Sequence, residues 1–209
     1  MTSTASAGQN PFEFVPRATQ DVELLEELNF FPGLKELLMM RQVHALEHAT
    51  VWVLSESSSQ SSSRSSNSPM GTDNQTLGGM STESGFYLYG QVNRNQLESA
   101  VRIALQRITS GEWDLAVHPR CGTNLSVNLL LTAGFAVGAN FFLPKDPLTQ
   151  LAGLGLAATT AATVAPDLGA IAQKYLTTGI PFNLAFEDII PVEDMWGRRA
   201  HFVRLRWQQ

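Results

Sequence analysis

Two long stretches without a charged side chain limit what this chain can fold into. The first runs from Cys121 to Pro144 and the second from Leu148 to Ala165, with a three-residue turn at 145–147 between them. A helix needs about 20 apolar residues to cross the hydrocarbon core of a bilayer, and both stretches are near that length. The second is rich in glycine, alanine and threonine, which let helices approach closely in lipid. We therefore expect a two-helix transmembrane hairpin.

A buried helix pair inside a soluble protein is the alternative, because the first stretch contains asparagine and threonine, the second contains threonine, and both are near the length threshold. The charges beside them indicate an orientation for the membrane case. Arg120, Lys174, Arg198 and Arg199 lie beyond the outer ends, whereas the turn contains Lys145. The positive-inside rule then places both chain ends on the cytoplasmic side.

Outside these stretches the composition is that of one ordinary domain. At 209 residues and 44% hydrophobic content the chain can bury one proper core. The net charge of -5 gives no basic surface for nucleic acid. A single cysteine, Cys121, excludes an intramolecular disulfide and favours a reducing compartment. Residues 1–20 contain no apolar run of the length found in secretory signals, so we expect a disordered tail there.

A short motif between Arg41 and Leu54 carries the most specific chemistry. It reads His44-x-x-Glu47-His48, and residues four apart on a helix share a face, so both imidazoles can point at one ion. This is the inverzincin pattern, in which two histidines bind zinc and the glutamate takes a proton from a water whose pKa the ion has lowered. A helix with two polar histidines and a solvated glutamate would have the same five letters.

Candidate third ligands follow later in the chain. His118 and Cys121 lie in one predicted turn, residues 118–124, and both are residue types that bind zinc. Taken singly, they would be an ordinary histidine and a small buried hydrophobe. Asp167 ends the second uncharged stretch, where a carboxylate at the bilayer boundary is a functional candidate or a helix cap. Arg120 would stabilise an oxyanion or anchor the hairpin at the interface.

Helices are predicted in the first half of the chain. Residues 21–29 form a short helix capped by Asp21, residues 34–54 carry the histidine motif, and a further helix starts at the Asn93 cap. The 34–54 helix is apolar around much of its circumference and should be largely buried. Residues 55–77 are serine-rich and cannot bury apolar area, so we expect a disordered loop.

Strands with alternating side chains complete the predicted fold. We expect an α+β architecture, in which residues 21–120 and 176–209 form a small mixed sheet with helices on the cytoplasmic side. A membrane helical hairpin at 121–175 interrupts it. His201, in the last strand, is expected to be an ordinary sheet residue. The predicted strands are Gly85–Val92, Trp113–His118, Asn183–Val192 and Ala200–Trp207.

Three blocks of sequence resemble a known bacterial family. HALEHAT at His44–Thr50 and HPRCGTN at His118–Asn124 are similar to its His-Gly-Ala-Glu-His and His-Pro-Arg-Cys-Gly-Thr-Ser motifs. PDLGAIAQKYLTTGIP at Pro166–Pro181 resembles its C-terminal segment. That family comprises uncharacterised multi-spanning membrane proteins described as predicted metal-dependent enzymes. GGMSTESGF at Gly78–Phe86 is similar to a closer group of uncharacterised cyanobacterial and plastid-type membrane proteins.

The resemblance implies a metal site and a membrane topology rather than a particular reaction. The chain departs from the family pattern by a longer gap between the first two blocks and by Asn124, where the family has serine. Asp167 stands where the family has glycine, so we place it behind His118 and Cys121 as the third ligand.

The expected function is that of a membrane-bound, zinc-dependent, peptidase-like hydrolase with Glu47 as general base. Its partners would be the lipid bilayer and a protein or peptide, which an edge strand such as Gly85–Val92 could bind by strand addition. The closer group suggests a cyanobacterial plasma or thylakoid membrane. One alternative is a non-enzymatic assembly or scaffold protein with a structural zinc site that includes both His118 and Cys121. Another is a metal-free membrane adaptor.

Overall fold

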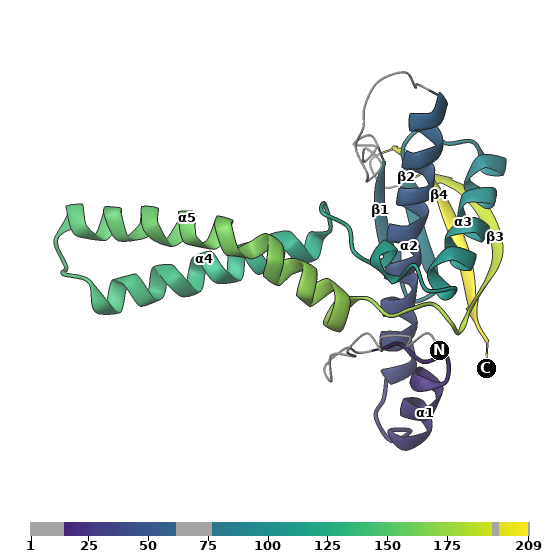
Figure 1. Cartoon of the computed structure of the whole chain (residues 1–209), viewed down its shortest axis with the longest axis horizontal. Helices are drawn as coiled ribbons and strands as arrows, with labels where there is room; N and C mark the ends of the chain where they lie inside the picture. The colour runs from purple at the N-terminus through teal and green to yellow at the C-terminus, as the bar shows by residue number, and fades with distance from the viewer. Residues whose placement is uncertain (1–14, 62–76, 194–196, 209) are drawn as a thin grey trace, which may run out of the picture.

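The computed structural model describes residues 15–61, 77–193 and 197–208. Figure 1 shows a compact head, made of the described residues before 122 and after 172, from which a long helical arm of residues 122–172 projects. The predicted tail lies outside the described residues up to residue 14, and most of the serine-rich loop, at 62–76, also lies outside them. The α+β class is confirmed.

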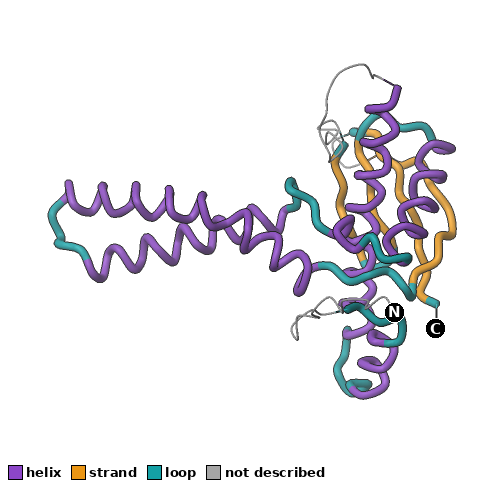
Figure 2. The backbone as a smooth tube through the Cα atoms, viewed as in Figure 1, coloured by secondary structure: helices purple, strands orange, loops and turns teal. Residues whose placement is uncertain are grey.

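Helix α2, Leu34–Ser61, is the centre of the head. Together with α3, Arg94–Thr109, it covers one face of the sheet (Figures 1 and 2). Side chains such as Val43, Leu46 and Phe86 are fully buried between them, and each contributes about 1.5–3 kcal/mol to folding. The helix runs on to Ser61, so its last turns occupy part of the segment predicted to be loop.

The two other head helices follow their predicted positions with different ends. Asn93 caps α3 as expected, because its side chain accepts from the amide of Gln96. Helix α1, Gln20–Glu27, starts after Thr19 rather than at an Asp21 cap. The Asp21 carboxylate instead accepts a hydrogen bond from Gln42 of α2, which ties α1 to the central helix.

Within the described residues, four strands form one sheet in the order β1-β2-β4-β3. Every pair is antiparallel, so the predicted mixed sheet is wrong in this respect: two hairpins, β1–β2 and β3–β4, join side by side. Gly85, at the first hairpin, has φ +150° and a Cβ there would lie 2.0 Å from the Val203 carbonyl oxygen, so glycine is required. The strands are Gly78–Thr82, Gly85–Tyr89, Leu184–Glu193 and Arg199–Trp207.

The prediction of a strand at Trp113–His118 is wrong. Trp113–Ala116 forms a 3-10 helix instead. The backbone acceptors that a strand would offer to a neighbour are used by α2, since the Ala116 carbonyl bonds His48 and the Val117 carbonyl accepts from the Trp52 indole.

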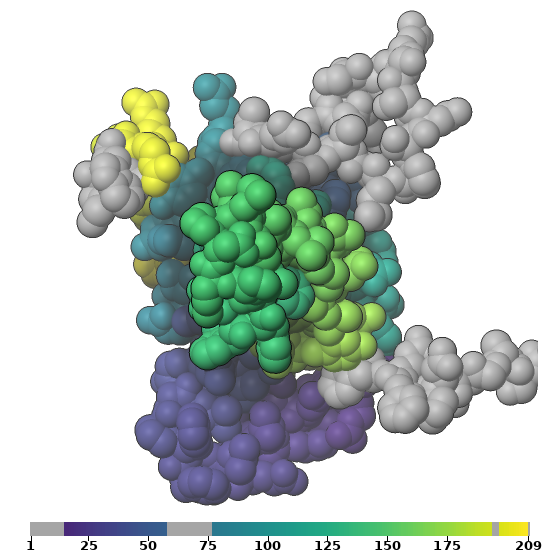
Figure 3. Space-filling view, turned by 90° about the vertical axis from the view of Figure 1, so that its left-hand side faces the viewer, coloured from purple at the N-terminus to yellow at the C-terminus, as the bar shows by residue number. Residues whose placement is uncertain are grey.

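The arm consists of α4, Gly122–Phe142, and α5, Pro147–Ala172, which run antiparallel (Figure 1). In Figure 3 the arm projects from the head toward the viewer. No residue of α4, all of which is described, is buried. On α5, which is also described throughout, burial is confined to small residues at every fourth position: Gly153, Ala157, Ala161, Ala165 and Gly169. By length and composition, α4 and the segment Pro147–Thr177 are each able to cross a membrane. A π-helical turn, Gln173–Thr177, leads from the arm back to the head.

Candidate metal centre

Helix α2 presents the two motif histidines on one face. The ring centroids of His44 and His48 are 4.4 Å apart. Nδ1 of His44 lies 3.0 Å from the Thr177 carbonyl oxygen, and Nδ1 of His48 lies 2.6 Å from that of Ala116. Because a carbonyl oxygen only accepts, each Nδ1 carries the proton and donates it. A second proton on Nε2 gives the ring a positive charge, whereas in the neutral ring Nε2 keeps its lone pair. In this tautomer a histidine binds a metal through Nε2.

The two carbonyls come from segments on either side of the arm. Ala116 ends the 3-10 helix before the arm, and Thr177 ends the turn after it. Arg41 of α2 holds that turn in place, since its guanidinium donates to the Thr178 carbonyl at 2.9 Å and its own carbonyl accepts from the Gly179 amide. Both imidazoles are therefore oriented by fixed backbone groups, as metal-binding histidines generally are.

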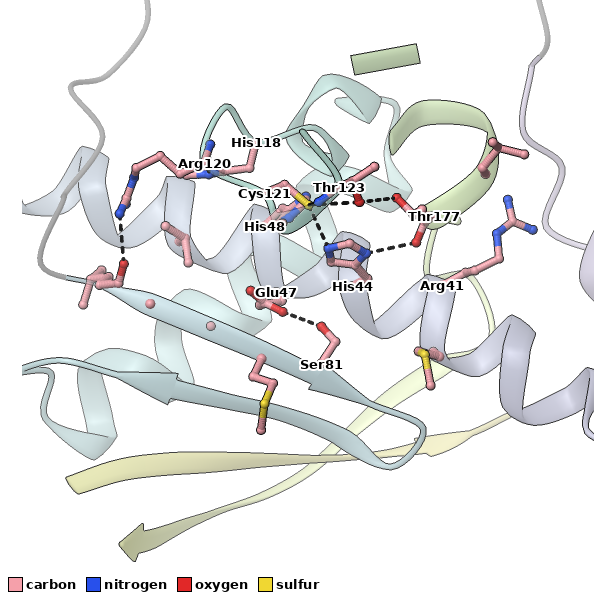
Figure 4. Close-up of a pocket in the computed structure, with 18 of the residues that line it drawn as sticks. Arg41, His44, Glu47, His48, Ser81, His118, Arg120, Cys121, Thr123 and Thr177 are labelled. Atoms are coloured by element: carbon pink, nitrogen blue, oxygen red, sulfur yellow. Dashed lines mark hydrogen bonds between the residues drawn. The ribbon is translucent and has the colours of Figure 1, made fainter. Parts of the chain in front are cut away.

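Cys121 brings a third ligand atom to the two histidines (Figure 4). Its Sγ lies 3.2 Å from Nε2 of His44, and the ligand atoms of His44, His48 and Cys121 all lie within 4.8 Å of one another. Tetrahedral zinc with ordinary bond lengths separates nitrogen and sulfur ligands by roughly 3.3–3.6 Å. Small side-chain adjustments would bring the set to that geometry, so the donor set fits zinc.

The surroundings of Cys121 favour a thiolate. Burial raises the pKa of the thiol, but the hydrogen bond and positive charge of His48, together with the hydrogen bonds of Thr123, outweigh it and hold the pKa below the ordinary value. The thiolate is the form of cysteine that binds metal. Cys121 also caps the N-terminus of α4, and its sulfur accepts from the Thr123 amide.

Glu47 lies beside His44, His48 and Cys121, which we call the ligand set, and it is buried (Figure 4). The Ser81 hydroxyl donates to its carboxylate. Strand β1 approaches so closely at Gly79 that a Cβ there would lie 2.0 Å from Oε1 of Glu47. Burial raises the pKa of the Glu47 carboxyl above its ordinary value, and the Ser81 hydrogen bond and the charge of His44 oppose this without cancelling it.

A pocket of about 580 Å³ gives access to these groups. His44, Glu47, His48 and Cys121 all line it, so ligands and carboxylate share one cavity. Its other walls come from β1, from the turn before α4 and from the turn after α5. The exposed apolar side chains among its lining residues are Leu37, Met40, Met80 and Leu176.

His118 lines the same pocket but does not belong to the ligand set. Its ring centroid is 5.6 Å from that of His48 and 4.9 Å from Trp52. Its Nδ1 accepts from the Arg120 amide, and its own amide donates to the buried Gln173 side chain. His118 thus helps to fix the turn that delivers Cys121.

Of the two other predicted site residues, one lines the pocket and the other does not. Arg120 lines the pocket, where its guanidinium donates to the Leu77 carbonyl at the start of β1. Asp167 is exposed on α5 and is not among the residues that line the pocket. Two residues after it, Gly169 packs on Asn124, where a Cβ would lie 2.1 Å from the amide oxygen.

Several groups that build the site carry little signal in the sequence. The Thr177 and Ala116 carbonyls are backbone atoms, and no residue type marks them. Ser81 and Gly79 lie in a glycine- and serine-rich strand without an alternating pattern. Gln173 is fully buried, but it is followed directly by Lys174, so its neighbours in the sequence do not mark it as a core residue.

Comparisons with known proteins give a family and a relative for this chain. Residues 39–189 match a family described as Domain of unknown function (DUF6391), so the match includes every residue of the ligand set. An uncharacterized protein of Picosynechococcus sp. is 55% identical over 195 residues, covering 93% of each chain. No solved structure matches this chain.

Proposed function

Since the chain belongs to the DUF6391 family, an uncharacterised family with a cyanobacterial member, we propose from its own side chains that it is a membrane-bound, zinc-dependent hydrolase of peptide bonds. One observation carries this proposal. His44 and His48 both donate Nδ1–H to backbone carbonyls, which leaves two Nε2 atoms for an ion next to Cys121.

The residues divide the chemistry among them. A zinc ion held by the ligand set would polarise a carbonyl group and lower the pKa of a water molecule. Three protein ligands leave the fourth tetrahedral position open, as in catalytic sites. Glu47, oriented by the Ser81 hydroxyl, takes the proton of the attacking water. Arg120, in the same pocket, supplies positive charge for the developing oxyanion.

The arm supports a membrane location. Its large apolar side chains are exposed, for example Leu130 at 73% and Phe142 at 89%, and such surfaces are stable in lipid rather than in water. Lys145 lies at the far end of the arm, whereas Arg120 and Lys174 lie at its root. By the positive-inside rule, we place the head on the cytoplasmic side of a cyanobacterial membrane.

Metal content is the first test. We expect the purified protein to contain about one zinc ion per chain by elemental analysis, and the variants His44→Ala, His48→Ala and Cys121→Ser to lose it. His201→Ala is the matched control, because this fourth histidine lies on β4 away from the pocket. Zinc retention in all three ligand variants would contradict the proposal.

The role of Glu47 is the second test. Glu47→Gln should keep zinc but lose at least about a hundredfold in the rate of hydrolysis of a fluorescently labelled unfolded protein, because general-base catalysis contributes about 10²–10⁴-fold. Glu83→Gln, in the exposed β1–β2 turn, is the control. Equal rates in the two variants would remove Glu47 from the chemistry.

A structural zinc site in a scaffold protein is the second candidate. It is favoured by the position of His118, which lines the same pocket and could become a fourth ligand after a side-chain movement. In that case His118→Ala would lower zinc content as much as His44→Ala does. In the hydrolase, His118→Ala leaves zinc bound.

A further inference from the structure

An open edge of the sheet lies beside the candidate metal centre. The expectation that Gly85–Val92 is an edge strand is wrong, because β2 pairs with β1 on one side and with β4 on the other. Strand β1 is outermost in the sheet, and in the part of the chain that the structure describes it pairs with β2 on one side alone. In a strand, alternate residues direct their N–H and C=O groups to opposite sides. An outermost strand therefore presents a row of backbone donors and acceptors to which another extended chain can pair.

This edge runs directly past the Glu47 carboxylate. Gly79 and Ser81 are two residues apart and share one face of β1. Both meet Glu47, the first through its backbone and the second through its hydroxyl. Figure 4 shows Ser81 and Glu47 pointing toward each other between β1 and α2. A chain paired along β1 would consequently bring its amides next to the general base.

The pocket next to this edge is suited to apolar side chains. Leu37 and Met40 come from α2 and Leu176 from the turn after the arm. All three are more than two-fifths exposed, and Leu176 is 70% exposed. Apolar side chains in that position lose water contact when an apolar group covers them.

We propose that β1 is the substrate template: an extended polypeptide segment pairs along it as an added strand and places a large apolar side chain in the pocket. This inference rests on the proposed hydrolase function and names its substrate class. In the reaction, a water oxygen forms a bond to the peptide carbonyl carbon and the C–N bond breaks. The proton that Glu47 removes from the water passes to the leaving nitrogen, so that one carboxylic acid and one amine result.

Binding can be measured separately from hydrolysis. The probe is a fluorescent, capped seven-residue peptide with lysine at each end and threonine and leucine alternating between them. It is titrated into the full-length Glu47→Gln variant with zinc, in detergent. Main-chain pairing does not depend on one sequence, so this probe should bind. N-methylation of alternate amides should weaken binding about tenfold or more, and N-methylation of the intervening amides should have little effect.

The apolar pocket is tested with exposed positions whose replacement leaves the core intact. Leu176→Ser and Met40→Ser should reduce the preference for a leucine peptide over its serine counterpart at least about threefold. Ile103→Ser is the matched control, because Ile103 is exposed on α3 and does not line the pocket. An equal effect of all three substitutions would contradict the assigned pocket.

The outcomes separate this inference from the function beneath it. Absence of peptide binding, or equal weakening by both N-methylated sets, overturns the template even if the wild-type protein hydrolyses a small amide in a zinc-dependent way. Alternating N-methyl effects in the absence of any zinc-dependent hydrolysis would support the template as a peptide-binding edge and overturn the hydrolase.

Discussion

The head and the arm contain similar apolar residues but bury them in different ways. In the head, large side chains such as Leu46 and Phe86 are fully enclosed between α2, α3 and the sheet. In the arm, small residues of α5 form the helix contact, whereas large ones such as Phe142 face outward. The head therefore encloses its own apolar interior, whereas the arm leaves its large apolar side chains exposed, as the proposed membrane location would require.

The largest expected effect comes from removing a core side chain of the head. Phe86→Ala should lower the free energy of unfolding by about 3–5 kcal/mol, because a cavity replaces the ring. Phe142→Ala, at the exposed tip of the arm, should change it by less than about 0.5 kcal/mol. Chemical denaturation in detergent, followed by tryptophan fluorescence, measures both. Similar values would remove the contrast between the two regions.

A charge in the middle of the arm tests its environment. Leu154→Arg should disfavour membrane insertion by about 2.5–3.5 kcal/mol, the cost of arginine at the centre of a spanning helix. Ile103→Arg on α3 is the control, since the two side chains are 49% and 45% exposed. The readout is the fraction of protein that stays with membranes after an alkaline wash. Full retention of Leu154→Arg would place the arm outside the bilayer.

A larger side chain at a buried alanine tests the contact between the two arm helices. Ala161 is buried against α4, and Leu at this position should destabilise the hairpin by about 1–3 kcal/mol through overpacking. The next residue, Ala162, is exposed, so Ala162→Leu is a control with the same change of side chain. Thermal unfolding followed by circular dichroism should show a lower midpoint for Ala161→Leu alone. Equal midpoints would mean that α4 and α5 do not pack through this face.

The smallest effect concerns the charged surface of the head. Arg107 pairs with Glu56 at 2.6 Å and with Glu112 at 2.7 Å. Its guanidinium holds the pKa of Glu112 below the ordinary value. The pair thus contributes stability above the ordinary carboxyl pKa, and this is lost as pH falls through the lowered one.

Arg107→Ala should therefore cost about 0.2–1 kcal/mol near neutral pH, as expected for solvated ion pairs. The cost should fade in acid. Urea denaturation near neutral pH and in acid measures this cost. A cost that grows in acid would show that the substitution removes packing of the side chain rather than charge.

Local patterns predicted the parts of the fold that depend on local interactions. The helical spacing of His44 and His48, the Asn93 cap and the two uncharged stretches all have direct counterparts in α2, α3 and the arm. Strand β1 was not predicted, because Gly78 and Gly79 have no side chains to alternate. Its position depends on pairing with β2 and on close approach to Glu47.

The candidate site shows the same division. His44, His48 and Cys121 were named from the sequence as candidate ligands, and the structure brings them together. The backbone groups that orient the rings were not, because they become partners only after chain segments far apart in sequence meet. His118 was predicted as a possible ligand on its residue type, and this stays a prediction; its hydrogen bonds also support the turn around Cys121.

Both roots of the arm meet at the ligand set. Cys121 immediately precedes α4, the Thr177 carbonyl that fixes His44 follows α5, and the hydroxyls of Thr123 and Thr177 are 3.1 Å apart. An ion bound by the ligand set would consequently hold the two ends of the arm together. If the two helices tilted or moved apart, the distance between the Cys121 sulfur and the His44 ring would change first. The geometry of the candidate site would therefore depend on the arrangement of the arm.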